Sequence, residues 1–189
     1  MSTTMIIVLA VAVVAVLAIA AAAWIFMQKR RTERLRSRFG PEYERVVGTG
    51  EDRRRAESVL EERQKRVEEL DIQSLSLEER RRFAQAWTRE QARFVDDPKG
   101  AVAEADRLIG EVMKTLGYSV GDFEQRAADI SVDHPMVVEN YRSAHQIAIR
   151  DRRGEAGTED LRKAMVHYRA LFEELLETRA SAAQGGRND

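Results

Sequence analysis

An uninterrupted apolar segment near the N-terminus constrains the fold of this 189-residue chain more than any other feature. Residues 5–27, with the sequence MIIVLAVAVVAVLAIAAAAWIFM, contain only uncharged and mostly aliphatic side chains. A helix of this length, rising about 1.5 Å per residue, is long enough to cross a hydrocarbon layer about 30 Å thick. Because a helix satisfies its own backbone hydrogen bonds, such a segment is stable in lipid. The sequence therefore predicts a transmembrane helix at residues 5–27.

Charged residues begin directly after this segment and predict its orientation. The whole chain has a formal net charge of −1, but residues 29–55 hold ten basic and five acidic side chains. Basic residues resist translocation, so we expect the C-terminal domain in the cytoplasm and residues 1–4 as a short tail outside it. Trp24 lies near the end of the apolar segment, at the membrane interface that indole prefers. The basic side chains that set the topology are Lys29, Arg30, Arg31, Arg34, Arg36 and Arg38.

A cleavable signal peptide is the main alternative to a retained membrane anchor. The alanines at 20–23 resemble a small-residue cleavage site. However, the N-terminal MSTTM has no basic residue, and the apolar run is longer than a usual signal-peptide core. We therefore favour the anchor. The basic residues after it either recruit anionic lipid or nucleic acid, or only fix the topology, and we favour the second interpretation.

Residues 28–50 are predicted to form a basic juxtamembrane segment with a short helix and a glycine hinge. Gly40 ends the preceding helix, and Pro41 can open the next one because proline is tolerated in a first turn. Gly48, Thr49 and Gly50 then provide a flexible connection.

An amphipathic helix is predicted over residues 51–72. Its narrow apolar stripe is interrupted by Arg63 and consists of Ala56, Leu60, Val67 and Leu70. Two interrupted heptads are too few for an independent coiled coil. We therefore expect either a stalk or an outer helix that packs on the body.

Residues 76–177 are predicted to form a compact bundle of about five helices. Ser76 and Glu79 fit a capping box, Asp97 with Pro98 opens a second helix, and Gly117 ends it. A short helix follows at about 122–130, and Thr158 is expected to cap the last one. The large aromatic residues expected in the core are Trp87, Phe94, Phe123, Tyr141 and Phe172. Residues 178–189 are too polar to fold and are predicted to be disordered.

The stretch ISVDHPMVVENYRSAH, residues 130–145, has the residue types of a metal or acid/base site. Proline disfavours helical geometry in the residue before it, which makes His134 the expected last non-helical residue and Pro135 the first helical one. Eleven positions separate His134 from His145, which corresponds to about 16 Å along an α-helix, whereas zinc ligands lie within about 2 Å of the metal. A pairing of His145 with His167 stays open. The chain has no cysteine, and we predict no catalytic, cofactor-binding or metal-ligating residue.

Four segments in the same order resemble a family of bacterial hypothetical proteins. They read RFGPEYERVV, FVDDPKGAVAEADRLIGEVM, FEQRAADISVDHPMVVENYRSAH and EDLRKAMVHYRALFEELLE. Members of that family are similar to this chain over residues 1–177 in having an N-terminal membrane helix and a charged, all-helical body. The resemblance implies no activity or substrate. Some members are described as secreted, whereas the charge distribution here favours a cytoplasmic body.

The expected architecture is therefore all-α: a single transmembrane helix, a stalk-like amphipathic helix and the bundle. We expect a single-pass protein of the bacterial inner (plasma) membrane that contacts the bilayer and acts as a non-catalytic protein-interaction or scaffold module. Its partner is an unidentified protein or a second copy of the chain. One alternative is a membrane-tethered nucleic-acid-binding protein that uses residues 30–38 and 53–55, although the net charge does not favour such a partner. The other is a helical enzyme that uses Tyr141, His145 or His167.

Overall fold

A computed structural model describes residues 3–48 and 52–177 of the chain, with side chains from residue 12 onward. Within these residues it contains eight α-helices and no strand, which confirms the predicted all-α class. The predicted disordered tail, residues 178–189, lies outside the described residues. The same holds for residues 1–2 of the predicted N-terminal tail and for Thr49 and Gly50 of the predicted glycine hinge.

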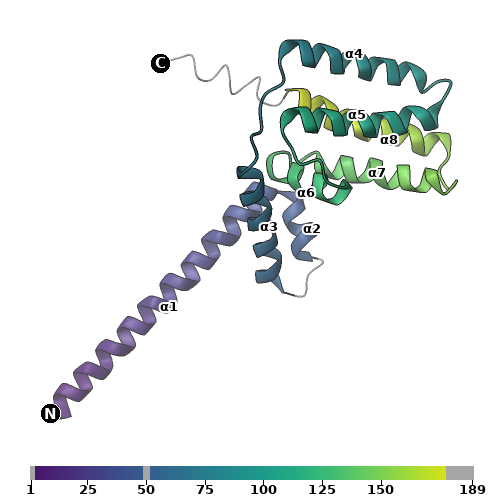
Figure 1. Cartoon of the computed structure of the whole chain (residues 1–189). Coiled ribbons are helices and arrows are strands. Elements are labelled where there is room, and N and C mark those ends of the chain that lie inside the picture. The colour runs from purple at the N-terminus through teal and green to yellow at the C-terminus, as the bar shows by residue number, and fades with distance from the viewer. Residues whose placement is uncertain (1–2, 49–51, 178–189) are drawn as a thin grey trace.

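The first helix, α1 (Thr3–Phe39), runs without a break through the apolar segment and the basic residues after it. It extends away from the other helices as a long rod (Figure 1). Among the described residues this is the one helix long and apolar enough to cross a membrane, judged by length and composition over Ala12–Phe39. A signal sequence near the N-terminus meets the same criteria. Its aliphatic side chains from Val13 to Ile19 are exposed, because no other helix covers this part of α1.

Two short helices pack on the last turns of α1. Gly40 takes a left-handed conformation (φ +49°), which ends α1 and lets the chain reverse into α2 (Pro41–Gly48), as predicted. The next helix is α3 (Arg53–Glu68), and Asp52 caps it by accepting a hydrogen bond from the N–H of Arg54. The smaller of the two hydrophobic cores of the protein, called the second core below, lies between these helices and Val132 from further along the chain. It consists of Leu35, Phe39, Tyr43, Leu60, Val67 and Val132.

Of the two placements expected for the amphipathic helix, a stalk or an outer helix on the body, the structure has the second. The helix α3 does not project as a stalk but contacts α1, α2 and α6. Its apolar stripe is buried, with Leu60 and Val67 packed in the second core. A helix with such a stripe is stabilised by covering it, so α3 lies against the body as an outer helix.

The bundle contains five helices between residues 77 and 177, namely α4 (Leu77–Arg93), α5 (Pro98–Leu116), α6 (Phe123–Asp133), α7 (Val138–Arg152) and α8 (Thr158–Glu177). The Ser76 capping box and the Asp97 cap are present as predicted. Gly117 ends α5 at φ +98°, and a Cβ there would lie 2.3 Å from the carbonyl oxygen of Asp71. The linker before α4 therefore crosses the end of α5 at a point where only glycine fits.

The main core lies between α4, α5, α7 and α8. Trp87 of α4 stacks on Phe172 of α8 with ring centroids 4.8 Å apart. Trp87, Phe172 and Tyr141 are buried as predicted, while Phe94 and Phe123 are partly buried against the same core. The helix α6 joins the two cores, because its residues contribute to both.

The predicted helix start at Pro135 is wrong. The preceding helix α6 continues to Asp133, and α7 begins only at Val138. His134, which precedes the proline, leaves helical geometry (φ −129°, ψ 54°), as expected for that position. Its carbonyl then accepts hydrogen bonds from the N–H groups of Val137 and Val138, which makes residues 135–137 a turn between the helices.

The last helix also begins differently from the prediction. Thr158 is the first residue of α8 and not its cap. Gly157 takes the preceding position, where its N–H donates to Asp160 Oδ2 and its carbonyl accepts from Leu161. Asp160 thus interacts with the helix start from inside the first turn, where a carboxylate is favourable.

Candidate functional site

Half of the basic residues predicted to set the membrane topology form ion pairs within the fold. Arg31 donates two hydrogen bonds of 2.6 Å to Glu61 on α3. Arg36 donates to Glu44 on α2 at 2.6 Å, and Arg38 donates to Asp133 on α6 at 3.3 Å. The final turns of α1 are therefore attached through their charges to three other helices.

Two apolar residues between these arginines are buried. Leu35 is 2% exposed and Phe39 is 0% exposed, both in the second core. They are four positions apart and so lie on one face of α1. Residues 31–39 thus belong to the folded body as well as to the helix that carries the apolar segment. This stretch was predicted to be part of a basic juxtamembrane segment, and its burial in a core was not expected.

The remaining predicted interface residues, Trp24, Lys29, Arg30 and Arg34, are exposed on α1. The Arg30 guanidinium lies 4.5 Å from the centroid of the Phe26 ring one turn earlier. Trp24 has a partner from elsewhere in the chain, because the Arg54 guanidinium of α3 lies 5.2 Å from its ring centroid. The first turn of α3 therefore returns to the end of the apolar segment.

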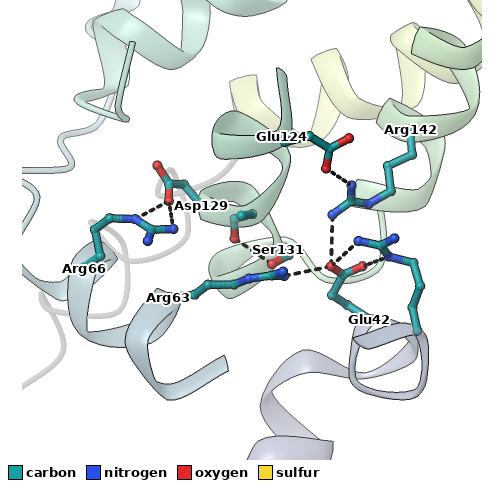
Figure 2. A network of polar contacts seen from close by, with 9 residues as sticks. Glu42, Arg63, Arg66, Glu124, Asp129, Ser131 and Arg142 are labelled. Carbon is teal, nitrogen blue, oxygen red and sulfur yellow. Dashed lines mark hydrogen bonds and ion pairs between the residues drawn. The ribbon is translucent and has the colours of Figure 1, made fainter. Parts of the chain in front are cut away.

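A buried carboxylate connects the α2 segment to the bundle (Figure 2). Glu42 on α2 is 2% exposed, and its Oε1 accepts 3.0 Å hydrogen bonds from Arg63 of α3 and from Arg142 of α7. Arg45 donates to Oε2 of the same carboxylate at 2.9 Å. Arg142 also donates to Glu124 of α6 at 3.2 Å. One carboxylate thus joins α2, α3 and α7, and through Arg142 it reaches α6.

The charge of Glu42 is stabilised by these neighbours. Burial alone would raise the pKa of Glu42, but the Arg45 hydrogen bond and the Arg142 charge hold it below its ordinary value of 4.5. Burial lowers the pKa of Arg63, although its hydrogen bond to Glu42 acts in the opposite direction. An arginine stays protonated at any physiological pH, so the cluster is a charged network.

Two further buried carboxylates make contacts of the same kind. Asp129 on α6 accepts from Arg66 of α3 at 2.7 Å (Figure 2). Gln125 also donates to Asp129, at 2.8 Å. Glu57 on α3 accepts from Thr32 of α1 at 2.7 Å and from the Tyr43 hydroxyl at 2.8 Å. Breaking a buried pair leaves an uncompensated charge, at a cost of about 3–5 kcal/mol. Glu42 and Asp129 therefore fix how α2 and α3 sit on the bundle, and Glu57 ties α3 to α1 and α2.

Sequence reasoning missed this network, although one signal was present. Arg63 stands in the middle of the apolar stripe of α3, and the sequence analysis treated it only as an interruption. A charged side chain on a buried face requires a partner, which here is Glu42. The identity of that partner depends on the tertiary fold, because 21 positions separate the two residues.

The three histidines lie in different environments. His134 contacts Glu174 Oε1 at 3.1 Å, and His167 contacts Asn140 Oδ1 at 2.8 Å. His145 stacks on Phe123 with ring centroids 3.6 Å apart, and burial lowers its pKa. No group of three His, Asp or Glu side chains in the part of the chain that the structure describes is arranged to hold a metal ion.

The buried tyrosines near His145 hold their protons at neutral pH. Burial raises the pKa of Tyr141 to about 12, and Arg126 donates to its hydroxyl at 3.0 Å. Burial also raises the pKa of Tyr168, which donates to Asp106 Oδ1 at 3.0 Å. A general base is most effective when its pKa is near the operating pH. The raised pKa values of both phenols are far above neutral pH, so neither is suited to that role. These contacts tie α7 and α8 to their neighbours.

Grooves occur on the bundle and beside the middle of α1. One of about 550 Å³ lies between α4 and α5, and its lining includes Arg89, Glu104, Arg107 and Lys114. Arg107 pairs there with Glu104 and Glu111. Two grooves of about 360 and 420 Å³ flank Trp24. They combine apolar atoms of α1 with basic side chains of α1 and α3, a composition suited to a ligand with both an acyl chain and a negative charge.

Comparisons of the chain with protein-family models, with curated proteins and with solved structures found no significant match. The contacts described above are therefore the basis for assigning a function.

Proposed function

We propose that this chain is a single-pass membrane protein whose cytoplasmic helical body acts as a non-catalytic protein-interaction or scaffold module. The observation that carries the proposal is the continuity of α1. One helix includes the exposed apolar segment and then the buried residues Leu35 and Phe39 of the folded body. A body joined to its anchor by an unbroken helix is held at a defined distance and angle from the bilayer, as a scaffold requires.

The proposed location is the bacterial inner membrane, with the N-terminus outside and the body in the cytoplasm. The charge asymmetry supports this orientation, because Lys29 and the following arginines resist translocation. Some of these arginines form ion pairs within the folded body. They still direct the orientation, because orientation is fixed during insertion, before the body has folded.

The proposed partner surface is the groove between α4 and α5. Figure 1 supports this choice, because α4 is the outermost helix of the bundle on the side away from α1. The groove combines cations and anions, among them Arg89, Glu104 and Lys114, with apolar atoms that include those of Phe83, Ala86 and Leu108. Such a surface suits a transient contact with a charged protein face, including a second copy of this chain.

Nucleic-acid binding is the less favoured proposal. It relied on the arginines at 30–38 and 53–55, but Arg31, Arg36 and Arg38 are engaged with carboxylates. Each internal ion pair removes a cation that would otherwise neutralise a phosphate.

Photo-crosslinking in intact cells tests the partner surface. A photoreactive amino acid is placed at Arg89 or at Lys114 in the groove, and at the exposed Glu173 of α8 as a matched control. Two differently tagged copies of the chain are expressed together, so that an adduct between copies is distinguished from one with another protein. We expect one discrete adduct from both groove positions and none from Glu173.

Adducts of equal intensity from all three positions would mean random collision and would contradict the proposed surface. A turnover reaction that purifies with the chain and survives loss of the adducts would contradict the non-catalytic role.

A further inference from the structure

We propose that the groove between α1 and the first turn of α3 binds the phosphate of an acidic phospholipid. The inference rests on the proposed membrane anchor and adds a ligand that the anchor alone does not require. It starts from two basic clusters, residues 29–34 on α1 and 53–55 on α3, which the fold brings to the same end of the body.

The relative direction of the two helices produces this convergence. Arg54 lies over Trp24, and Arg31 pairs with Glu61. The Arg31–Glu61 contact is thus seven positions further along both helices than the Trp24–Arg54 contact, so α3 runs in the same direction as α1. The N-terminal turn of α3 consequently points back toward the apolar segment, as Figure 1 shows.

The depth of this turn in the membrane follows from Trp24. Indole rings concentrate at the boundary between hydrocarbon and headgroups. A guanidinium 5.2 Å from the centre of the Trp24 ring is then at the level of the lipid phosphates. Lys29 and Arg53 line the same groove as Trp24 and Arg54, together with Gln28. The groove therefore offers an apolar wall for an acyl chain and cations for a headgroup.

The carboxylates around this groove are engaged inside the protein. Glu57 accepts hydrogen bonds from Thr32 and Tyr43, and Glu61 accepts both of its hydrogen bonds from Arg31. Asp52 caps α3. By contrast, Lys29 and Arg54 have no carboxylate partner among the described residues.

The distribution of charge therefore selects an anion. Arg53 is oriented by the Tyr43 hydroxyl at 3.3 Å and by Glu57 at 3.4 Å, which leaves Lys29 and Arg54 as the principal ligands. A phosphodiester presents two free oxygens and one negative charge, and guanidinium and ammonium groups donate charge-assisted hydrogen bonds to such oxygens. Each basic residue at a membrane surface contributes a factor of about five in affinity for acidic lipid.

The test uses Trp24 as the reporter. The chain has two tryptophans, so Trp87→Phe leaves Trp24 as the only source of indole fluorescence. The full chain is reconstituted in mixed vesicles of phosphatidylcholine and phosphatidylglycerol. In one preparation the phosphatidylglycerol carries brominated acyl chains, which quench nearby indole, and in the other the phosphatidylcholine carries them at the same mole fraction. The ratio of the two quenching signals reports which lipid is enriched beside Trp24.

We expect a ratio well above one, and a fall toward one when Lys29→Gln and Arg54→Gln are combined. The matched control combines Arg81→Gln with Arg82→Gln, which removes the same charge from an arginine run on α4 and is expected to leave the ratio unchanged. Arg54→Lys retains the charge and is expected to retain most of the preference. Circular dichroism of each variant checks that the helices are intact.

Three results would overturn the lipid site. They are a ratio of one for the parent chain, an equal fall in the site variant and the control, and loss of the preference on adding excess inorganic phosphate, which would identify a site for soluble phosphate. The anchor is tested separately by the same data. Quenching by brominated phosphatidylcholine without any preference removes the lipid site alone, whereas absence of quenching by both lipids removes the anchor and the site together.

Discussion

Glu42 on α2 and Arg142 on α7 are 100 positions apart in the sequence, and Arg142 Nη2 donates a 3.0 Å hydrogen bond to Glu42 Oε1. Both side chains are largely buried. The contact joins the part of the chain that follows the apolar helix to the main bundle. It is one of the buried contacts that fix the position of the body relative to α1.

Glu42→Ala is therefore expected to lower the free energy of unfolding by about 3–5 kcal/mol, because the substitution leaves buried arginines without their counter-charge. Denaturant unfolding of the full chain in detergent, followed by circular dichroism, measures this loss. Glu44→Ala is the matched control, since Glu44 pairs with Arg36 at the exposed surface. Its expected cost is about 1 kcal/mol or less. Equal losses for the two variants would contradict the role of Glu42.

The network also predicts a specific acid sensitivity. The pKa of Glu42 is lowered in the folded protein, so the folded state releases this proton more readily than the unfolded state does. The stabilisation is then fully present above the ordinary value of 4.5 and is lost as the pH falls through the folded pKa. Below pH 4.5 the parent chain should lose stability more steeply than Glu42→Gln, as measured by unfolding at a series of pH values. Parallel curves would show that Glu42 is not the responsible group.

The buried end of α1 makes a separate prediction. Phe39→Ala should destabilise the body by about 3–5 kcal/mol, because it removes a fully buried ring from the second core. Phe26→Ala removes the same atoms from an exposed position on the same helix, and in detergent it should change the unfolding free energy little. Thermal unfolding followed by circular dichroism compares the two variants. A large effect from Phe26→Ala, or none from Phe39→Ala, would mean that α1 and the body are not joined in this way.

Two glycines of the α5 region provide a matched pair for the backbone. Gly117→Ala is expected to destabilise the chain by about 1–3 kcal/mol, because φ is +98° and the added Cβ would meet the Asp71 carbonyl. Gly110 lies within α5 with open space around its Cα, so Gly110→Ala should stabilise by about 0.5–1 kcal/mol. Changes of the same sign in denaturant midpoints would contradict this assignment.

Local sequence signals predicted much of the helical architecture. Ser76, Asp97 and Gly117 mark helix ends that the structure confirms, because capping depends on a few neighbouring residues. The apolar segment was equally recognisable by length and composition. The start of α7 was mispredicted because Pro135 is compatible both with a first helical turn and with a connecting turn. Contacts of the His134 carbonyl decide between them, and sequence spacing does not show those contacts.

The candidate site was less predictable than the helices. Leu35 and Phe39 are only two apolar residues among many charges, so their burial against α2 and α3 gives a weak periodic signal. The arginines at 53–55 entered the sequence-based predictions only as part of a possible nucleic-acid-binding surface. Their placement beside Trp24 results from α3 running parallel to the end of α1, which depends on long-range packing.

The most direct measurement of the central claim is the membrane topology of the full chain. Alkaline phosphatase, which is active only outside the cytoplasm, and a fluorescent protein that matures only inside it are each fused after Asp189. We predict a fluorescent, phosphatase-inactive fusion in the membrane fraction that resists extraction by carbonate. An active phosphatase fusion, or a soluble chain whose N-terminus begins near Ala23, would contradict a body held on the cytoplasmic side by α1.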